Sequence, residues 1–213
     1  MKRKIKNIFQ KIWIKVYSFQ RKRALINSNF SIISNNCWAG KIYQSYGIKY
    51  KTPTVGLFFM SEDFIKFVGN LEFYLNCNLN FISSSESKYV KIFKDNSTKY
   101  PDFGTYPIGS LDGIEIHFLH YKNELTAYES WNKRKERINF DNLIIKMNDQ
   151  NEFLEEHLEI FNNLPFKNKL FFSVNKLPNA VLIKNGLGNV EYLDEPYGKS
   201  KVFNVTDFIN SIK

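Results

Sequence analysis

Short apolar runs alternate with amphipathic stretches along most of the chain. Residues 113–121 (GIEIHFLHY) alternate apolar and polar positions and give the strongest strand signal. The predicted strands cover residues 30–34, 55–59, 79–83, 89–93, 113–121, 142–147, 169–174 and 180–184. The predicted helices cover about 62–75, 124–138 and 205–212, and another opens at Asp149 or Asn151 and runs to about 163. Strands that alternate with such helices indicate parallel crossovers. We therefore predict an α/β fold, a Rossmann-like sandwich with a mostly parallel sheet.

The sequence predicts a basic amphipathic leader helix over residues 1–26, ahead of a single α/β domain at 27–213. Its apolar residues recur at helical spacing: Ile5, Ile8, Phe9, Ile12, Val16 and Phe19, widened by Trp13 and Tyr17. The opposite face carries Lys and Arg, as in helices that lie among lipid headgroups. We predict that residues 2–20 bind an anionic membrane surface. Docking of the leader on its own domain and an organellar transit peptide are the alternatives.

The formal net charge of +9 belongs to the leader. Of the 30 Lys and Arg residues, nine lie within residues 1–23, so the 21 that remain balance the 21 Asp and Glu residues. A neutral body lacks the broad basic surface of a nucleic-acid-binding domain, so we expect no specific nucleic-acid partner. Two cysteines make no disulfide framework, and no apolar run is long enough to span a bilayer. These features predict a cytoplasmic protein, peripherally associated with the inner face of the membrane.

The segment SNNCWAG, at 34–40, directly follows a predicted buried strand. Ligands of α/β sheets bind beyond the carboxyl ends of strands. Its candidate residues offer amides, a thiol, an aromatic ring and close backbone approach to a sugar: Asn35, Asn36, Cys37, Trp38 and Gly40. Cys37 is a candidate nucleophile if a cation or histidine lowers the pKa of its thiol. The alternative is an ordinary turn with a buried Cys and Trp.

The segment HFLHY, at 117–121, contains two histidines, His117 and His120. A spacing of three places them on opposite faces of a regular strand, which argues against a shared metal. His120, at the strand's end, is a candidate general base near neutral pH. A structural role at the end of the strand is an equally good interpretation. We expect His117 to be a packing residue.

The predicted helix TAYESWNKRKERIN, at 126–139, carries Ala127, Ser130, Arg134 and Arg137 on one face. Two arginines beside two small residues suit an anion such as the phosphates of a nucleotide sugar. The alternative is a solvated face on which the arginines pair with nearby Glu residues.

Several common fingerprints are absent from the sequence. It contains no GxGxxG, Walker A or GxSxG motif, no Asp-x-Asp, and no cluster with zinc spacing. We therefore expect no metal and no cofactor, with a nucleotide sugar as a possible substrate.

Four segments in this order resemble a bacterial family of unknown function: FSIISNNCWAGKIYQSYGIKYKTPTVGLFF, EDFIKFVGNLEFYL, YPIGSLDGIEIHFLHY and AYESWNKRKERIN. Members of that family are often labelled exopolysaccharide or capsular polysaccharide biosynthesis proteins. The resemblance covers about residues 28–175 and leaves out the leader. It implies an α/β domain linked to surface-polysaccharide gene clusters, without a mechanism. Its motif positions are Asn36, Cys37, Trp38, Gly40, Tyr50, Pro53, Thr54, His120, Tyr121, Trp131, Arg134, Arg137 and Asn139.

Two functions follow as competing hypotheses. The first is a glycosyltransferase-like, metal-independent transferase acting on a sugar or lipid-linked sugar. Its candidate catalytic residues are His120 and Cys37, and its candidate substrate-binding residues include Tyr50, Thr54, Tyr121 and Asn139 from the resemblance. The second is a non-catalytic accessory protein of a surface-polysaccharide assembly complex. Convergence of the candidate residues on one cleft would favour the enzyme.

Overall fold

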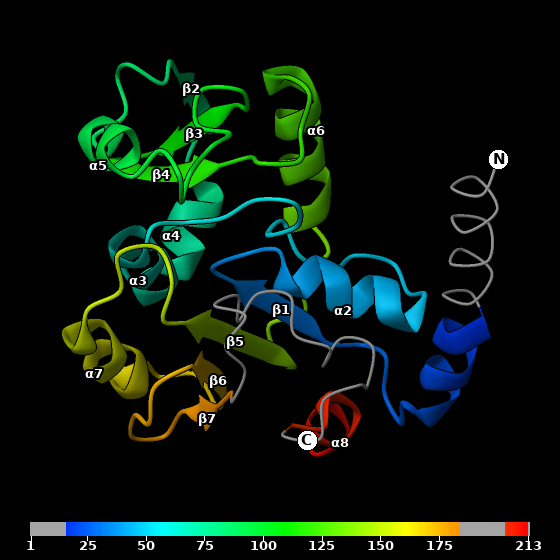
Figure 1. Cartoon of the computed structure of the whole chain (residues 1–213). Helices are drawn as coiled ribbons and strands as arrows, with labels where there is room; N and C mark the ends of the chain where they lie inside the picture. The colour runs from blue at the N-terminus through cyan, green and yellow to red at the C-terminus, as the bar shows by residue number, and fades with distance from the viewer. Residues whose placement is uncertain (1–15, 184–202, 213) are drawn as a thin grey trace, which may run out of the picture.

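A parallel sheet forms the centre of the fold, as the computed structural model of the chain shows (Figure 1). The structure describes residues 16–183 and 203–212. The strands are β1 (Ser31–Ser34), β5 (Leu143–Asn148), β6 (Asn168–Ser173) and β7 (Val181–Leu182), in the order β1-β5-β6-β7. Every neighbouring pair in this sheet is parallel. The predicted α/β class is therefore confirmed.

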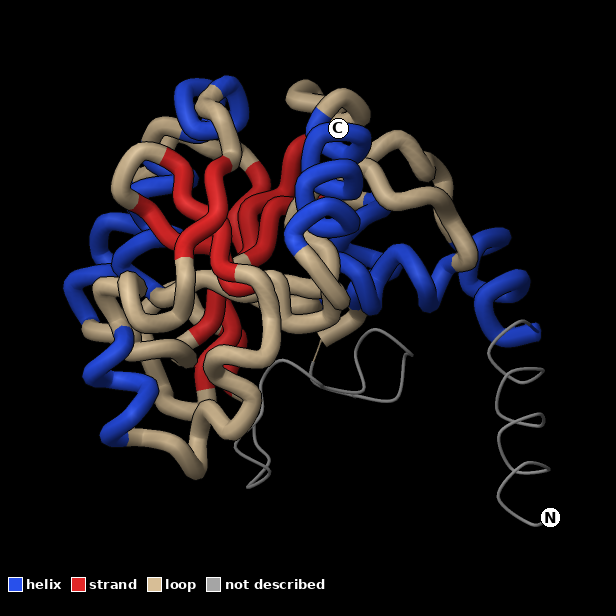
Figure 2. The backbone as a smooth tube through the Cα atoms, turned by 90° about the horizontal axis from the view of Figure 1, so that it is seen from above, coloured by secondary structure: helices blue, strands red, loops and turns tan. Residues whose placement is uncertain are grey.

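Helices cover both faces of this sheet, as the view in Figure 2 shows. One face is covered by α2 (Trp38–Tyr46) and α8 (Val205–Asn210), and the other by α3 (Ser61–Gly69) and α7 (Glu155–Asn163). The remaining helices are α4 (Leu71–Asn76), α5 (Val90–Asp95) and α6 (Glu124–Lys135). Because side chains alternate along a strand, Ile32 and Ile144 pack with α2 and α8, and Ile33 and Ile145 pack with α3 and α7. Both faces of β1 and β5 are therefore covered, and each of these buried strands has an apolar pair of isoleucines, one directed to each face.

A second, antiparallel sheet is inserted between β1 and β5. It contains β2 (Asn80–Ile82), β3 (Ile108–Leu111) and β4 (Ile114–His117), in the order β2-β3-β4. We expected a single, mostly parallel sheet, and this small sheet is an addition to it. Helices α3 to α6 belong to the same long crossover.

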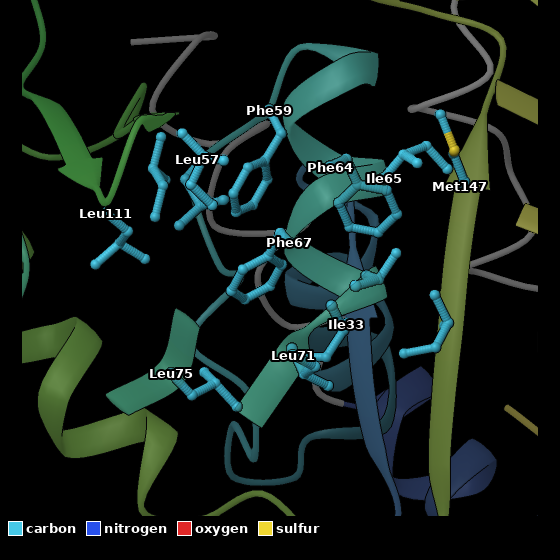
Figure 3. Close-up of a cluster of buried hydrophobic side chains, with 14 of the residues drawn as sticks. Ile33, Leu57, Phe59, Phe64, Ile65, Phe67, Leu71, Leu75, Leu111 and Met147 are labelled. Atoms are coloured by element: carbon cyan, nitrogen blue, oxygen red, sulfur yellow. The ribbon is translucent and has the colours of Figure 1, made fainter. Parts of the chain in front are cut away.

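Helix α3 joins the two sheets through one hydrophobic cluster. Phe64 and Phe67 lie among Ile33 of β1, Met147 of β5 and Leu111 of β3, as the labelled side chains in Figure 3 show. Burying each of these aromatic side chains contributes on the order of 2 kcal/mol. The insertion is therefore packed against the parallel sheet.

The end of the leader is a helix over residues 16–24 at the edge of the molecule (Figures 1 and 2). Arg21 is only 8% exposed, and its Nη2 atom donates to the Tyr46 hydroxyl over 2.8 Å. Val16 and Phe19, from the predicted apolar stripe, are 56% and 60% exposed. The described end is thus fixed to the body through Arg21 while these two apolar side chains face solvent. Residues 2–15 lie outside the described residues, and the boundary at 26 stays a prediction.

No helix within residues 16–183 or 203–212 has the length and apolarity that a membrane crossing requires.

The predicted helix at 62–75 is divided into α3 and α4 at Asn70, and the predicted strand at 113–121 ends at His117. Three further predicted elements have the wrong conformation. The expected loop at 34–40 turns into α2 from Trp38 onward, and Gly47, with a φ of 61°, ends that helix. The expected strand at 89–93 is mostly part of helix α5. The expected strand at 55–59 makes only one isolated bridge, between Phe58 and His117, since the φ of 73° at Gly56 interrupts extended backbone.

Candidate functional site

A cleft of about 390 Å³ lies between helix α2, the segment 50–56, the turn after β4 and helix α6. Six of the predicted site residues line it: Cys37, Gly40, Tyr50, His120, Tyr121 and Arg134. They come from four separate stretches of the sequence. The cleft is therefore the place where the structure brings the predicted residues together.

Helix α2 forms one wall. Cys37 follows the carboxyl end of β1, and its Sγ atom lies 3.7 Å from the Leu57 carbonyl oxygen, to which it donates. Lys41 and Gln44 continue the same helical face at the next turns. Gly40 lets the opposite segment approach, because a Cβ atom there would lie 3.0 Å from Cγ1 of Val55.

Arg134 of α6 forms the opposite wall in a fixed orientation. Its Nη1 atom donates to the Tyr121 hydroxyl, which itself donates to the Val55 carbonyl over 2.8 Å. Its Cζ atom lies 5.0 Å from the Tyr50 ring centroid and 5.9 Å from that of Tyr121. Burial raises the pKa of Tyr121, partly offset by Arg134. Tyr121 is therefore a neutral hydroxyl at pH 7 that positions the guanidinium.

His120 is exposed and lines the cleft just after β4. Its backbone N–H donates to the Gly56 carbonyl over 3.0 Å. Gly56 has a φ of 73°, and a Cβ atom there would lie 3.4 Å from Cβ of His120. Glycine at position 56 thus allows the two segments to approach and brings His120 to the cleft.

The cleft lining is cationic. It contains Lys41 and Arg134, together with His120, and no Asp or Glu. The ion pairs found within the described parts of the chain include none of these three residues. The alternative for this helix was that Arg134 and Arg137 pair with nearby Glu residues. The described parts of the chain show no such ion pair.

Four of the predicted residues lie in the core and outside the cleft lining. The Asn35 Nδ2 atom donates to Asn148 Oδ1 over 2.7 Å and ties β1 to β5. Asn36 Oδ1 accepts from the Trp38 backbone N–H and from Nζ of Lys146, both over 3.1 Å. Trp38 is buried and packs edge-on against a core phenylalanine, so it offers no exposed platform. Thr54 Oγ1 accepts from the Ser34 N–H over 3.1 Å.

Arg137 and Asn139 lie beyond the end of α6 at Lys135, so Arg137 does not continue the helical face of Arg134. The Nη1 atom of Arg137 donates to the Tyr50 carbonyl over 3.4 Å. The Asn139 side chain donates to the Asn29 carbonyl over 2.8 Å. Both side chains make contacts that hold loops in place, and neither is in the cleft lining.

His117 packs in the core, as expected. Its ring stacks on Phe58 with centroids 4.6 Å apart and meets Phe93 edge-on at 5.0 Å. Neither ring nitrogen has a hydrogen-bond partner among the described residues. Burial, together with the nearby Lys88 charge, lowers the pKa of His117 to about 3, so it is neutral at pH 7.

The sequence interpretation missed Lys41 and Gln44. Both follow Cys37 at spacings of four and seven, which is one face of a helix. Two signals could have revealed that helix: Asn36, whose side chain accepts the Trp38 N–H, and Gly47 at the end. Within the described ranges, no three His, Cys, Asp or Glu residues gather to hold a metal ion.

The fold and the cleft define an α/β protein with a cationic cleft beyond the first strand of its parallel sheet. The chain belongs to the family described as Domain of unknown function (DUF1919), which matches residues 8–210. It is also similar to an uncharacterized protein of Haemophilus influenzae, with 34% identity over 179 residues, which are 81% of this chain and 78% of the relative. The family match includes most of the leader, which we expected to lie outside the resemblance. These names state no activity, so the polysaccharide label stays a prediction.

Proposed function

We propose that this protein acts in surface-polysaccharide biosynthesis as a metal-independent, glycosyltransferase-like transferase whose sugar substrate binds in the cleft between α2 and α6. The observation that carries the proposal is the convergence of Cys37, His120 and Arg134 on that cleft. Its place beyond the carboxyl end of β1 is where α/β proteins usually bind ligands. The polysaccharide part of the proposal rests on the family resemblance.

His120 is the proposed general base. Its imidazole would take the proton of an acceptor hydroxyl as that oxygen bonds to the anomeric carbon. The bond from that carbon to a phosphate oxygen of the nucleotide sugar breaks in the same step, and cationic side chains of the cleft stabilise the leaving phosphate. Cys37 is a second candidate, a nucleophile at the start of α2.

Incubation of the full chain with a panel of nucleotide sugars and membrane extracts as acceptors tests this proposal. We expect turnover that falls at least ~100-fold in His120→Gln, in line with the usual contribution of a general base. Cys37→Ser would be compared with Cys77→Ser, because Cys77 is half-buried and not in the cleft lining. The absence of both binding and turnover for every donor would overturn the proposal.

A non-catalytic accessory role is the second candidate, and the environment of Cys37 favours it. The thiol is only 3% exposed and donates to a backbone carbonyl, as a structural cysteine does. This function predicts that His120→Gln and Arg134→Gln change the recovery of partner proteins from membranes and affect no reaction.

We also propose that the leader holds the protein on the anionic inner face of the cytoplasmic membrane. The solvent exposure of Val16 and Phe19 supports this, because a self-docking helix would bury its apolar stripe. Co-sedimentation with phosphatidylglycerol vesicles should fall at least tenfold in the double variant Val16→Asp/Phe19→Asp. Ile26→Asp is the matched control, since Ile26 is exposed but lies outside the stripe. Equal binding of all three proteins would contradict the proposal.

A further inference from the structure

Two cations from different helices line the cleft, and no acidic residue lines it. Lys41 lies on α2 and Arg134 on α6, and both line the cleft. Neither belongs to the ion pairs of the described residues. The lining residues include no carboxylate that could neutralise them. Their positive charge is therefore available to a ligand.

We infer that Lys41 and Arg134 form a subsite for a phosphate or diphosphate ester. This inference rests on the proposed function, because the ester is taken to be part of the sugar substrate. Two positive charges match a group that carries about two negative charges at pH 7, as a phosphate monoester does. A carboxylate brings one charge and leaves the second cation without a partner. The charge count thus favours phosphate over an acidic sugar.

The orientation of Arg134 fits this role. The hydrogen bond that the described residues give to its guanidinium engages Nη1, through the Tyr121 hydroxyl. A guanidinium has five N–H donors in a rigid fork, so further donors remain for phosphate oxygens. Tyr121 donates to the Val55 carbonyl and accepts from Arg134, which holds the fork in place before a ligand arrives.

The second cation of the cleft is Lys41, whereas the sequence analysis predicted Arg137 for this role. Arg137 bonds to the Tyr50 carbonyl beyond the end of α6 and is not in the cleft lining. Lys41 lies one helical turn after Cys37, on the same face as Gln44. Gln44 donates to the Tyr50 hydroxyl over 2.9 Å, which links this helical face to the ring under Arg134. The two cations thus belong to one connected cleft.

Two sources of such an ester fit the same chemistry, a nucleoside diphosphate sugar and a lipid-linked sugar phosphate. Binding of uridine diphosphate and of a short-chain, water-soluble alkyl phosphate would distinguish the two sources. The source that binds more tightly than inorganic pyrophosphate identifies the rest of the ligand. Both results agree with the subsite itself.

The test is titration calorimetry of the full chain with inorganic phosphate and pyrophosphate. We expect Lys41→Gln and Arg134→Gln each to weaken pyrophosphate binding at least tenfold. Lys133→Gln is the matched control, because Lys133 is an exposed cation on α6 beside Arg134 and outside the cleft lining. Arg137→Gln should resemble that control. Thermal unfolding of each variant would show that the fold is intact, and Lys41→Gln, at a half-buried position, carries the test if Arg134→Gln does not fold.

The inference fails if the unaltered chain binds neither anion at millimolar concentration, or if Arg137→Gln weakens binding while Lys41→Gln does not. Because binding is measured without turnover, a chain that binds pyrophosphate but transfers no sugar would keep the subsite and overturn only the proposed reaction.

Discussion

The guanidinium of Arg134 lies over the ring of Tyr50, with its Cζ atom 5.0 Å from the ring centroid. Tyr50 in turn accepts a hydrogen bond from Gln44 of α2. A chain of contacts therefore runs from α2, through the segment after it, to α6. It connects the two walls of the cleft, so the guanidinium of Arg134 has a defined place before any ligand binds.

Replacing Tyr121 with phenylalanine should loosen this arrangement. The substitution removes the hydroxyl that donates to the Val55 carbonyl and accepts from Arg134. We expect the free energy of unfolding to fall by about 1–2 kcal/mol, the usual cost of unsatisfied, partly buried polar groups. Urea denaturation measures it. Tyr128→Phe, at an exposed position on α6, should change stability by less than about 0.5 kcal/mol; similar losses in both variants would contradict the role of the hydroxyl.

Replacing Arg21 with alanine should release the end of the leader. The Arg21 guanidinium bonds to the Tyr46 hydroxyl and lies 4.3 Å above that ring. Without it, we expect the amides of the helix over residues 16–24 to exchange with deuterium at least tenfold faster. Arg23→Ala is the control, because that guanidinium lies 5.0 Å from the ring of Phe19 within the same helix. Unchanged protection in Arg21→Ala would show that other contacts hold the helix.

His117 should make the protein less stable in mild acid. Its pKa is about 3 when folded and about 6.5 when exposed, so between these values the unfolded chain binds a proton that the folded chain does not. The contribution of His117 to the free energy of unfolding is therefore fully present above pH 6.5 and is lost as the pH drops toward 3. Burial is the largest influence on the pKa of His117, and the Glu115 carboxylate, 3.8 Å from its Nε2 atom, does not reverse the direction.

The variant His117→Phe keeps a ring against Phe58 and has no titrating nitrogen. As the pH falls from 7 to 5, we expect the free energy of unfolding of this variant to rise by about 2 kcal/mol relative to that of the unaltered chain. Denaturant unfolding at the two pH values measures this difference. Asp63, Lys88 and Glu115 are the same in both proteins, so the comparison is directed at the imidazole of His117. A difference that does not change with pH would mean that His117 is protonated in the folded protein.

Two glycines should respond oppositely to alanine. At Gly109 of β3, a Cβ atom would lie 2.6 Å from Leu79 Cδ1 and 2.7 Å from Phe118 Cε2, so we expect a loss of about 1–3 kcal/mol. At Gly69, the last residue of α3, a Cβ atom meets nothing within 4 Å, so Gly69→Ala should gain about 0.5–1 kcal/mol. Thermal melts of both variants check the pair. A stable Gly109→Ala protein would contradict the close packing of β3.

The strands of the parallel sheet could be predicted from the sequence because they are buried on both faces. The runs at 30–34, 142–147 and 169–174 differ from β1, β5 and β6 by only a residue or so at their ends. Helix α6 was also predictable, since Asn123 caps it by accepting from the Thr126 N–H. Local patterns identify an element when its burial and its cap agree.

Elements whose conformation depends on distant partners were not predictable. The segment at 90–95 has β-branched and aromatic residues, yet it is helical and buries Phe93 against Phe58 and Tyr100. Short apolar runs of this kind fit a strand or a helix equally well. Six of the residues that line the cleft were predicted from the sequence. Asn35, Asn36 and Thr54 were also predicted there, but they make hydrogen bonds in the core that no local pattern reveals.

The antiparallel insertion between β1 and β5 makes the cleft depend on contacts between distant parts of the chain. Cys37 and Lys41 precede this insertion, whereas His120 and Arg134 lie near its end, so the walls meet only after a long loop has closed. A chain that pairs β1 with β5 but leaves the insertion unfolded would possess a sheet and no place for a ligand. Ligand binding at the cleft therefore requires both the parallel sheet and the insertion to be folded. A conformational probe at the cleft would distinguish fully folded chains from partly folded ones.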